Sequence, residues 1–360
     1  MKTPHENILI TGGAGFVGSN LATLYKQRFP RARVTALDNL KRRGSELNLP
    51  KLRDVGVRFA HADVRCPDDL SALGAEPFDL IIECSAEPSV LAGYGGSPGY
   101  VVQTNLVGTV NCLELARAHR SDFVFLSTSR VYPIQKLASL NLVEKPTRFE
   151  MSPQQEVPGA SGFGISEEFP LAGHRSLYGA TKLASELLIE EYREAYGLRT
   201  IINRCGVIAG PWQMGKVDQG VFSLWVLAHY FKRPLRYIGF GGTGKQVRHV
   251  LHVKDLFGLL DAQLAHLDQL AGGTFNVGGG PECSLSLVEM TEICREVTGN
   301  KVPIESSAEN RPGDVPVYVT DCRRVRSHVA WDSPASPTAV LTDIFDWVRD
   351  NESQLAQLVE

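Results

Sequence analysis

The residues with the clearest chemical potential are a tyrosine and a lysine four positions apart, Tyr178 and Lys182. On a helix this spacing brings the two side chains to one face. A free tyrosine has a pKa of about 10, so its phenol is a weak base at neutral pH, but a nearby ammonium stabilises the phenolate. Such a pair can take a proton from a substrate hydroxyl while the adjoining carbon gives a hydride to a redox cofactor.

A hydroxyl side chain accompanies this pair. Thr128 lies within a Ser-Thr-Ser run that follows the apolar stretch 123–126, and it can donate a hydrogen bond to the reacting oxygen. By itself, a Tyr-x-x-x-Lys spacing occurs by chance in many helices. Its position downstream of a glycine-rich loop and of Thr128 favours the catalytic interpretation, so we predict catalytic roles for Thr128, Tyr178 and Lys182.

A glycine-rich loop lies near the start of the sequence, with Gly12, Gly15 and Gly18 spaced three apart. It connects the apolar run 8–10 to a helical pattern over 16–28. Glycines here permit a tight turn and let the backbone approach a pyrophosphate, to which a helix N-terminus offers free N–H groups. An acid 20 residues after Gly18 favours a dinucleotide site over an ordinary glycine turn.

That acid is Asp38, at the end of the second expected strand, where a carboxylate can accept both hydroxyls of an adenosine ribose. The carboxylate would repel a 2′-phosphate and therefore favours NAD. The basic residues 41–43 leave NADP as the alternative, because arginines there can hold a 2′-phosphate. We expect Asp63 and Val64, after the third strand, to meet the adenine. The predicted cofactor contacts are Gly12, Gly15, Phe16, Val17, Gly18, Asp38, Asn39, Asp63, Val64, Tyr178 and Lys182.

The composition limits the class of protein. The chain has 360 residues, 43% of them apolar, with 37 Lys and Arg against 40 Asp and Glu. This near balance gives no indication of a nucleic-acid or membrane binder. We see no secretory signal and no apolar stretch near the roughly 20 residues that span a bilayer. Seven scattered cysteines without a Cys-x-x-Cys pair favour reduced thiols and a cytoplasmic location, and the nine histidines show no metal-ligand spacing.

The secondary structure must position these residues, and the sequence predicts alternating strands and helices. Apolar runs indicate strands at 8–10, 34–37, 57–60, 80–82, 123–126 and 200–202, and helical patterns cover 16–28, 105–118 and 176–196. The alternation predicts an α/β fold, a doubly wound parallel sheet of the Rossmann type with a smaller, mostly C-terminal substrate-binding lobe. We place the NAD-binding domain at 1–205, with 245–270 returning to it, and the substrate-binding lobe mainly at 206–360. The segment 133–175 is expected to be an irregular active-site or interface loop rather than a plain surface insertion.

Together these features resemble the extended short-chain dehydrogenase/reductase family, the NAD-dependent epimerases and dehydratases of nucleotide sugars. The resemblance covers nearly the whole chain, from the loop at 12–18 through Tyr178 and Lys182 to the Arg-Pro-Gly-Asp run at 311–314. Further segments that look like family signatures are 244–248, 252–256 and 275–279.

The resemblance implies a redox-neutral reaction on a nucleotide-diphosphate sugar. A sugar carbon would be oxidised to a ketone with bound NAD and then reduced from its other face, and the branch with the closest resemblance acts at C2. Arg248 and Arg311 would hold the diphosphate, since planar guanidinium forks suit phosphate oxygens. Gln219 lies in a segment shared with that branch, so we expect all three residues to bind substrate.

Departures from the family pattern keep other reactions open. The 4,6-dehydratases carry an Asp-Glu pair just after the catalytic Thr, where this chain has Ser129 and Arg130, so dehydration ranks below epimerisation. Residues 83–87 replace a more usual His-Leu-Ala-Ala. The alternatives are a 4-epimerase, a UDP-uronate decarboxylase whose anionic sugar Arg130 would suit, a ketone reductase with loosely bound NADPH, and a non-catalytic dinucleotide-binding protein. The helices near 105–118 and 176–196 resemble those that form a homodimer interface in the family.

Overall fold

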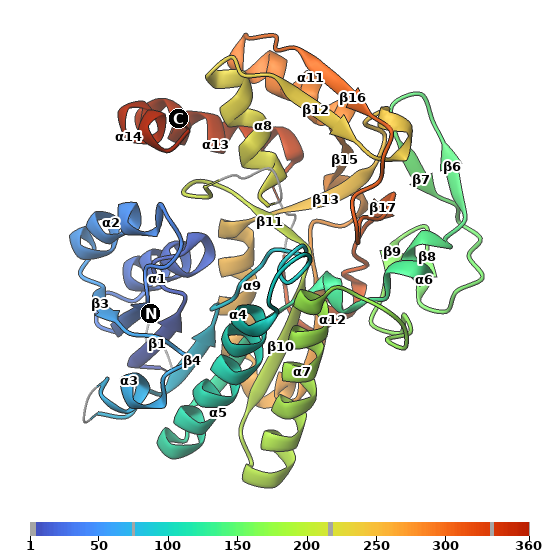
Figure 1. The fold of residues 1–360 in the computed structure, drawn as a ribbon. Coiled ribbons are helices and arrows are strands. Elements are labelled where there is room, and N and C mark those ends of the chain that lie inside the picture. Colours follow the sequence, from blue (N-terminus) through green and yellow to red (C-terminus); the bar gives the residue numbers. More distant parts are fainter. Residues whose placement is uncertain (1–4, 74–75, 215–218, 332–334, 360) are drawn as a thin grey trace.

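Seven parallel strands form the central sheet, in the order β14-β10-β5-β4-β1-β2-β3 (Figure 1). The computed structural model describes residues 5–73, 76–214, 219–331 and 335–359. The strands are β1 Asn7–Thr11, β2 Arg33–Asp38, β3 Arg58–His61, β4 Leu80–Glu83, β5 Asp122–Thr128, β10 Thr200–Cys205 and β14 Gly273–Val277. The strand order reverses direction between β1 and β4, which is where doubly wound sheets bind ligands. The predicted α/β Rossmann fold is confirmed.

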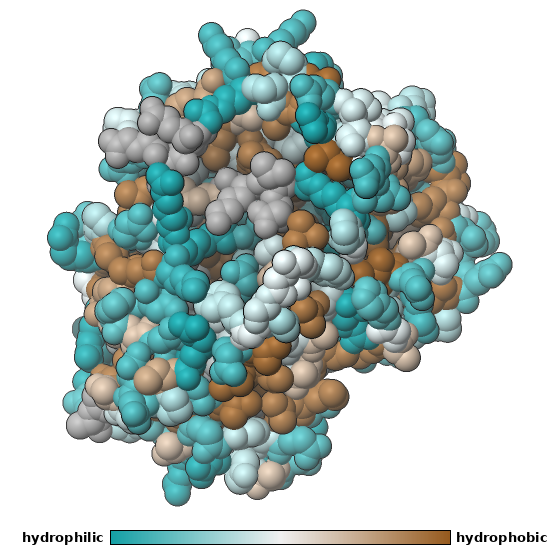
Figure 2. Space-filling view, viewed as in Figure 1, coloured by the Kyte–Doolittle hydropathy of each residue, from teal (hydrophilic) through white to brown (hydrophobic). Residues whose placement is uncertain are grey.

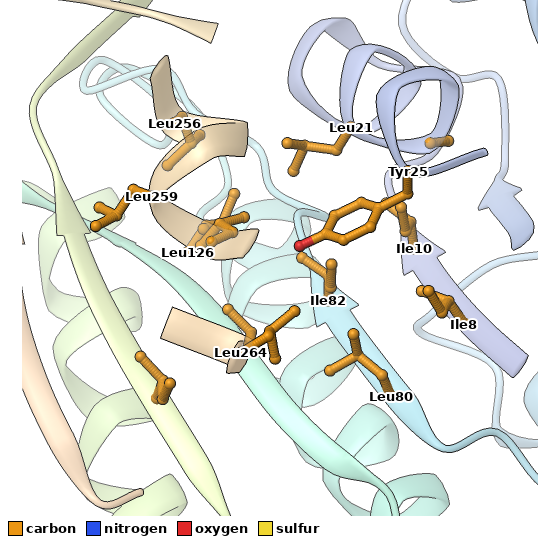
Figure 3. Close-up of a cluster of buried hydrophobic side chains, with 14 of the residues drawn as sticks. Ile8, Ile10, Leu21, Tyr25, Leu80, Ile82, Leu126, Leu256, Leu259 and Leu264 are labelled. Atoms are coloured by element: carbon orange, nitrogen blue, oxygen red, sulfur yellow. The ribbon is translucent and has the colours of Figure 1, made fainter. Parts of the chain in front are cut away.

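Helices cover both faces of this sheet, because side chains along each strand alternate between the faces. In β1, Ile8 and Ile10 join one core, whereas Leu9 joins the other. Figure 3 shows the first core, in which Tyr25 of α1 and Leu259 of α9 lie among strand residues. The helices around the sheet are α1 Phe16–Arg28, α2 Leu49–Asp54, α3 Pro67–Ser71, α5 Gly108–His119, α7 Leu177–Tyr196, α9 Val253–Ala265, α10 Leu267–Leu270 and α12 Arg323–His328.

A second lobe has a separate apolar core. That core gathers side chains such as Phe222, Trp225, Leu285 and Ile344. Its elements are β11 Val207–Ala209, α8 Val221–Tyr230, β12 Leu235–Ile238, β13 Val247–His252, β15 Ser284–Ser286, α11 Leu287–Thr298, β16 Ile304–Ser307, β17 Val317–Tyr318, α13 Pro337–Asp350 and α14 Glu352–Val359. The chain alternates between lobes, since α9 and β14 belong to the sheet-bearing one. The division at residue 205 stays a prediction, and the sheet shows that the returning chain extends to Val277.

The segment 133–175 is more ordered than the sequence suggested. It contains α6 Ile134–Ala138 and two antiparallel hairpins, β6 Leu142–Glu144 with β7 Phe149–Met151, and β8 Ala160–Ser161 with β9 Gly164–Ile165. The expectation of an irregular loop was wrong, because Leu137, Ile165 and Phe169 pack with Val315 and Tyr318 into a small core. In Figure 1 this green segment lies beside β17.

The helix expected over 105–118 begins earlier and is not uniform. It starts as α4 Gly99–Val102, passes through a π-helical turn at Gln103–Val107 and continues as α5. Asn105 therefore lies inside that turn. Its side chain accepts the Glu87 N–H at 2.7 Å and donates to the Thr181 hydroxyl at 3.2 Å, which ties this turn to α7. These bonds give Asn105 a structural role.

Candidate active site

The glycine-rich loop forms a cradle at the carboxyl end of β1. α1 begins at Phe16, and the first N–H groups of a helix have no partner within it. A Cβ atom on Gly18 would lie 2.2 Å from the Gly12 carbonyl oxygen, and one on Gly12 would lie 2.9 Å from the Cys84 carbonyl oxygen. Gly12 also has a φ of +61°, which favours glycine. This cradle of glycines beside free helix N–H groups fits the pyrophosphate of a dinucleotide.

Asp38 ends β2 beside this cradle. Its carboxylate accepts the Ala14 N–H at 3.1 Å and the Leu40 N–H at 2.8 Å. Burial raises the pKa of Asp38, and these backbone hydrogen bonds oppose the shift. The loop thus holds the carboxylate where the adenosine ribose lies when a dinucleotide places its pyrophosphate in such a cradle.

The two residues expected to meet the adenine differ in their surroundings. Asp63 accepts a hydrogen bond from Asn39 at 2.9 Å and forms an ion pair with Arg65 at 2.6 Å. The hydrogen bond from Arg65 is the main reason that the pKa of Asp63 lies well below its usual range. Val64 is buried, and a Cβ on Gly108 would lie 2.8 Å from its side chain. The Val64 side chain therefore belongs to the core.

Thr128, Tyr178 and Lys182 come together where β5 ends and α7 begins. The Ser176 hydroxyl caps α7 by accepting a backbone N–H of the first turn at 3.2 Å, which fixes the turn that carries Tyr178. Burial raises the pKa of Tyr178 to about 12, while a hydrogen bond with Thr128 and the charge of Arg130 work against that rise. Lys182 follows one turn later and is 1% exposed. The three residues share one site, in which the phenol is protonated at neutral pH.

A cleft of about 930 Å³ opens above this site and is lined by residues of both lobes. Seven predicted residues line it: Phe16, Val17, Thr128, Tyr178, Gln219, Arg248 and Arg311. The other predicted residues lie outside its lining: Gly12, Gly15, Gly18, Asp38, Asn39, Asp63, Val64 and Lys182. All of residues 133–175 are described and none lines the cleft, and the role of this segment as an active-site or interface loop stays a prediction.

Arginines dominate the charged part of the cleft lining. Among the described lining residues, the charged side chains are Arg130, Arg233, Arg236, Arg248, Arg311, Glu305 and Asp314. An excess of guanidinium groups suits a diphosphate, which carries negative charge at neutral pH. Sequence reasoning missed Arg233 and Arg236, because neither spacing nor a motif sets them apart from surface arginines.

Three residues proposed to contact the substrate also form hydrogen bonds with other parts of the protein. Arg248 forms an ion pair with Asp314 and donates to the Val315 carbonyl at 2.6 Å. Arg130 donates to the Gly313 carbonyl at 3.0 Å. Gln219 accepts a hydrogen bond from Arg42, which reaches it from the sheet-bearing lobe. These contacts attach segment 313–315 to the cleft wall and join the two lobes at its edge.

Comparison with known proteins agrees with this geometry. The sequence model of the NAD dependent epimerase/dehydratase family matches residues 8–278. The chain is 28% identical to a CDP-paratose 2-epimerase of Salmonella typhi over 94% of this chain and 98% of that one. It is 29% identical to a dTDP-glucose 4,6-dehydratase of Streptomyces niveus over 96% and 94% of the two chains.

A solved structure supports the fold. A UDP-glucuronic acid 4-epimerase of Bacillus cereus, solved with UDP-glucuronic acid and NAD, superimposes with a TM-score of 0.78 at 21% identity. The match covers 96% of this chain and 99% of that one. The lobes and the sheet therefore have the arrangement seen in that structure.

Proposed function

The chain belongs to the NAD dependent epimerase/dehydratase family of enzymes, and from this premise we propose that it epimerises a nucleotide-diphosphate sugar through a transient ketone. The observation that carries the proposal is the Thr128–Tyr178–Lys182 group beside a glycine cradle that fits NAD. Ser129 and Arg130 follow Thr128, where the dehydratase pattern has an Asp-Glu pair. The chain thus lacks the acid and base that elimination of water needs at those positions, which favours epimerisation.

Each of the three residues has a separate part in the proposed chemistry. Thr128 donates a hydrogen bond to the reacting oxygen, and the phenolate form of Tyr178 takes the proton of that hydroxyl. Bound NAD supplies the hydride acceptor. Lys182 stabilises the phenolate by its charge. Tyr178 then returns the proton when the ketone is reduced from the other face, so the reaction has no net redox change.

The specific reaction that we propose resembles that of a CDP-paratose 2-epimerase, with inversion at C2. Its support is the near end-to-end similarity to the Salmonella typhi enzyme. A nucleotide-sugar 4-epimerase or a UDP-uronate decarboxylase is the second candidate, because Arg130 lines the cleft next to Tyr178 and suits an acidic sugar.

Proton NMR tests the proposal. The purified enzyme is incubated, without added reductant, with one sugar nucleotide at a time: a CDP-, UDP-, GDP- or dTDP-sugar. A new anomeric signal at constant NADH supports epimerisation, and the changed coupling constants identify the carbon. Release of carbon dioxide would establish the decarboxylase instead. Formation of a 4-keto-6-deoxy sugar would contradict the proposal.

Substitution of Arg248 tests the diphosphate contact. Arg248→Met should weaken binding of a nucleoside diphosphate sugar by about 10- to 100-fold, because a charge-assisted hydrogen bond contributes about 1.5–3 kcal/mol. Calorimetric titration measures this effect. Arg295→Met is the matched control. Arg295 lies on α11, pairs with Glu292 and does not line the cleft, so this variant should bind the sugar nucleotide with wild-type affinity. Equal affinity of Arg248→Met and the wild type would remove Arg248 from the diphosphate site.

We also propose that the protein is a homodimer joined through α5 and α7. Figure 2 shows apolar side chains gathered over these helices, and Leu187 and Tyr196 of α7 are 57% and 56% exposed. Exposed apolar area of this kind marks an interaction surface.

Among the described residues, no helix combines the length and apolar character needed to cross a membrane.

A charged residue in this surface should separate the subunits. Leu187→Glu is expected to sediment as a monomer at concentrations where the wild type is a dimer, because an unpaired carboxylate is costly to bury. Val143→Glu is the control, since Val143 is 43% exposed on β6, away from α7. A wild-type monomer, or a Leu187→Glu dimer, would contradict this interface.

A further inference from the structure

A carboxylate lies buried in the sheet next to the catalytic lysine. Glu83 is the last residue of β4, and it follows the apolar residues Leu80, Ile81 and Ile82. Its side chain has no exposed area, and its Oε2 atom lies 3.7 Å from the Nζ atom of Lys182, which is itself 1% exposed. A charged group at the end of such a strand is unusual, because buried acids are rare unless they are paired.

Besides Lys182, the polar neighbours of Glu83 include the Thr109 hydroxyl and the Ser85 backbone N–H. The Thr109 hydroxyl lies 3.5 Å from Glu83 Oε2, while Oε1 has no hydrogen-bond partner among the described residues. On the other side, Lys182 Nζ lies 3.7 Å from the centroid of the Phe125 ring, close enough for a cation–π contact. Two ionic groups are thus enclosed together and interact chiefly with each other.

Besides Glu83 and Tyr178, three thiols lie close enough to Lys182 to feel its charge. Burial raises the pKa of Cys84, Cys112 and Cys205, so all three are neutral at physiological pH. Burial also raises the pKa of Glu83, and the nearby Lys182 ammonium opposes that rise. Glu83 is therefore the described acid that can balance the ammonium.

Burial disfavours an ammonium that has no anionic partner. A lysine that leaves water without an anionic partner loses its proton at a lower pH, and a neutral amine gives no electrostatic support to a phenolate. An adjacent carboxylate reverses this tendency. The same carboxylate opposes ionisation of Tyr178, whose other influential neighbours are Thr128, Arg130 and Cys205. Burial of Tyr178 remains the main reason that its phenol is protonated at rest.

We propose that Glu83 is a positioning residue that pairs with the Lys182 ammonium and fixes it one helical turn after Tyr178. Glu83 lies outside the cleft lining, and it acts through Lys182. The proposal deepens the proposed function and rests on it, because it takes Lys182 as a member of the catalytic group. It predicts a coupled pair in the folded protein and a pH dependence that the pair controls.

A double-mutant cycle of thermal stability tests the coupling without any substrate. Glu83→Gln and Lys182→Met should each lower Tm by about 5 °C or more, because each leaves one buried charge unpaired. The double variant should be more stable than the two single losses predict by addition. Additive losses would overturn the pairing, whatever reaction the enzyme catalyses.

The pH profile separates a tuning role from a merely structural one. Glu83→Gln removes the carboxylate that offsets the desolvation of the Lys182 ammonium. The basic limb of kcat/KM should move to lower pH by at least about one unit, and NAD affinity measured by titration should fall over the same range. Glu83→Asp, which keeps the charge, should restore most of both.

The outcomes distinguish a failure of the role of Glu83 from a failure of the proposed function. A non-additive cycle with a shifted NAD-affinity profile supports the role of Glu83 even if none of the sugars tested is converted, which would count against the proposed function alone. A non-additive cycle with an unshifted pH profile would reduce Glu83 to a structural partner and overturn the proposal.

Discussion

Tyr178→Phe should lower kcat by about 10²- to 10⁴-fold, the range expected when a positioned acid–base group is removed. The substitution removes only the hydroxyl that bonds with Thr128, and the ring remains in its buried place. NAD affinity and Tm should change little. The loss appears in kcat more than in KM, because proton transfer is required in the transition state and not for binding.

The role of Tyr178 also predicts the direction in which kcat of the wild type changes with pH. Burial raises the pKa of Tyr178 to about 12, so the fraction of phenolate grows as pH rises through the neutral and alkaline range. Where proton abstraction limits the rate, kcat should increase with pH below that value, and Tyr178→Phe should abolish the increase.

Tyr192→Phe is the matched control for this variant. Tyr192 lies on the same helix, but its hydroxyl donates to Glu114 and does not line the cleft. The control should therefore keep the wild-type kcat and its pH profile. Wild-type turnover by Tyr178→Phe, or an equal loss in Tyr192→Phe, would remove Tyr178 from the role of proton acceptor.

Gly18→Ala should weaken NAD binding by about 10- to 100-fold, matching an overpacking cost of about 1–3 kcal/mol. The new Cβ would lie 2.2 Å from the Gly12 carbonyl oxygen, and because the contact is with backbone, α1 or the loop must move. A displaced helix N-terminus no longer presents its N–H groups to the pyrophosphate. Fluorescence or calorimetric titration with NAD measures the loss.

Gly258→Ala provides the comparison within the same fold. Gly258 lies in α9, where a Cβ would meet no atom within 4 Å. Alanine in a helix interior should stabilise the protein by about 0.5–1 kcal/mol and leave NAD affinity unchanged. If Gly18→Ala bound NAD as tightly as Gly258→Ala does, the loop would not be the pyrophosphate site.

Local patterns explain why the sheet and the cofactor loop were predictable. The spacing of Gly12, Gly15 and Gly18 depends on contacts within a single turn, and the apolar runs depend on the alternation of side chains along each strand. The Tyr178–Lys182 pair likewise lies within one helix. Such features need no knowledge of distant residues.

Features that depend on distant packing were not predictable. Val64 belongs to the core because Gly108 on α5 leaves room for it. The segment 133–175 folds into hairpins because Val315 and Tyr318 supply an apolar surface from much later in the chain. Glu83 of β4 and Lys182 of α7 lie far apart in the sequence, so their pairing could not be predicted. The one sequence feature that pointed to Glu83 was a charged residue at the end of an apolar strand.

In the proposed reaction, one sugar carbon gives up its hydrogen as hydride and receives the same hydrogen back. Proton NMR of the epimerised product formed in D₂O tests it most directly. The reacting carbon is expected to keep its protium, because a hydride held by the bound cofactor does not exchange with solvent. Deuterium at the inverted carbon would show inversion by proton abstraction from carbon, and would contradict oxidation to a ketone and re-reduction.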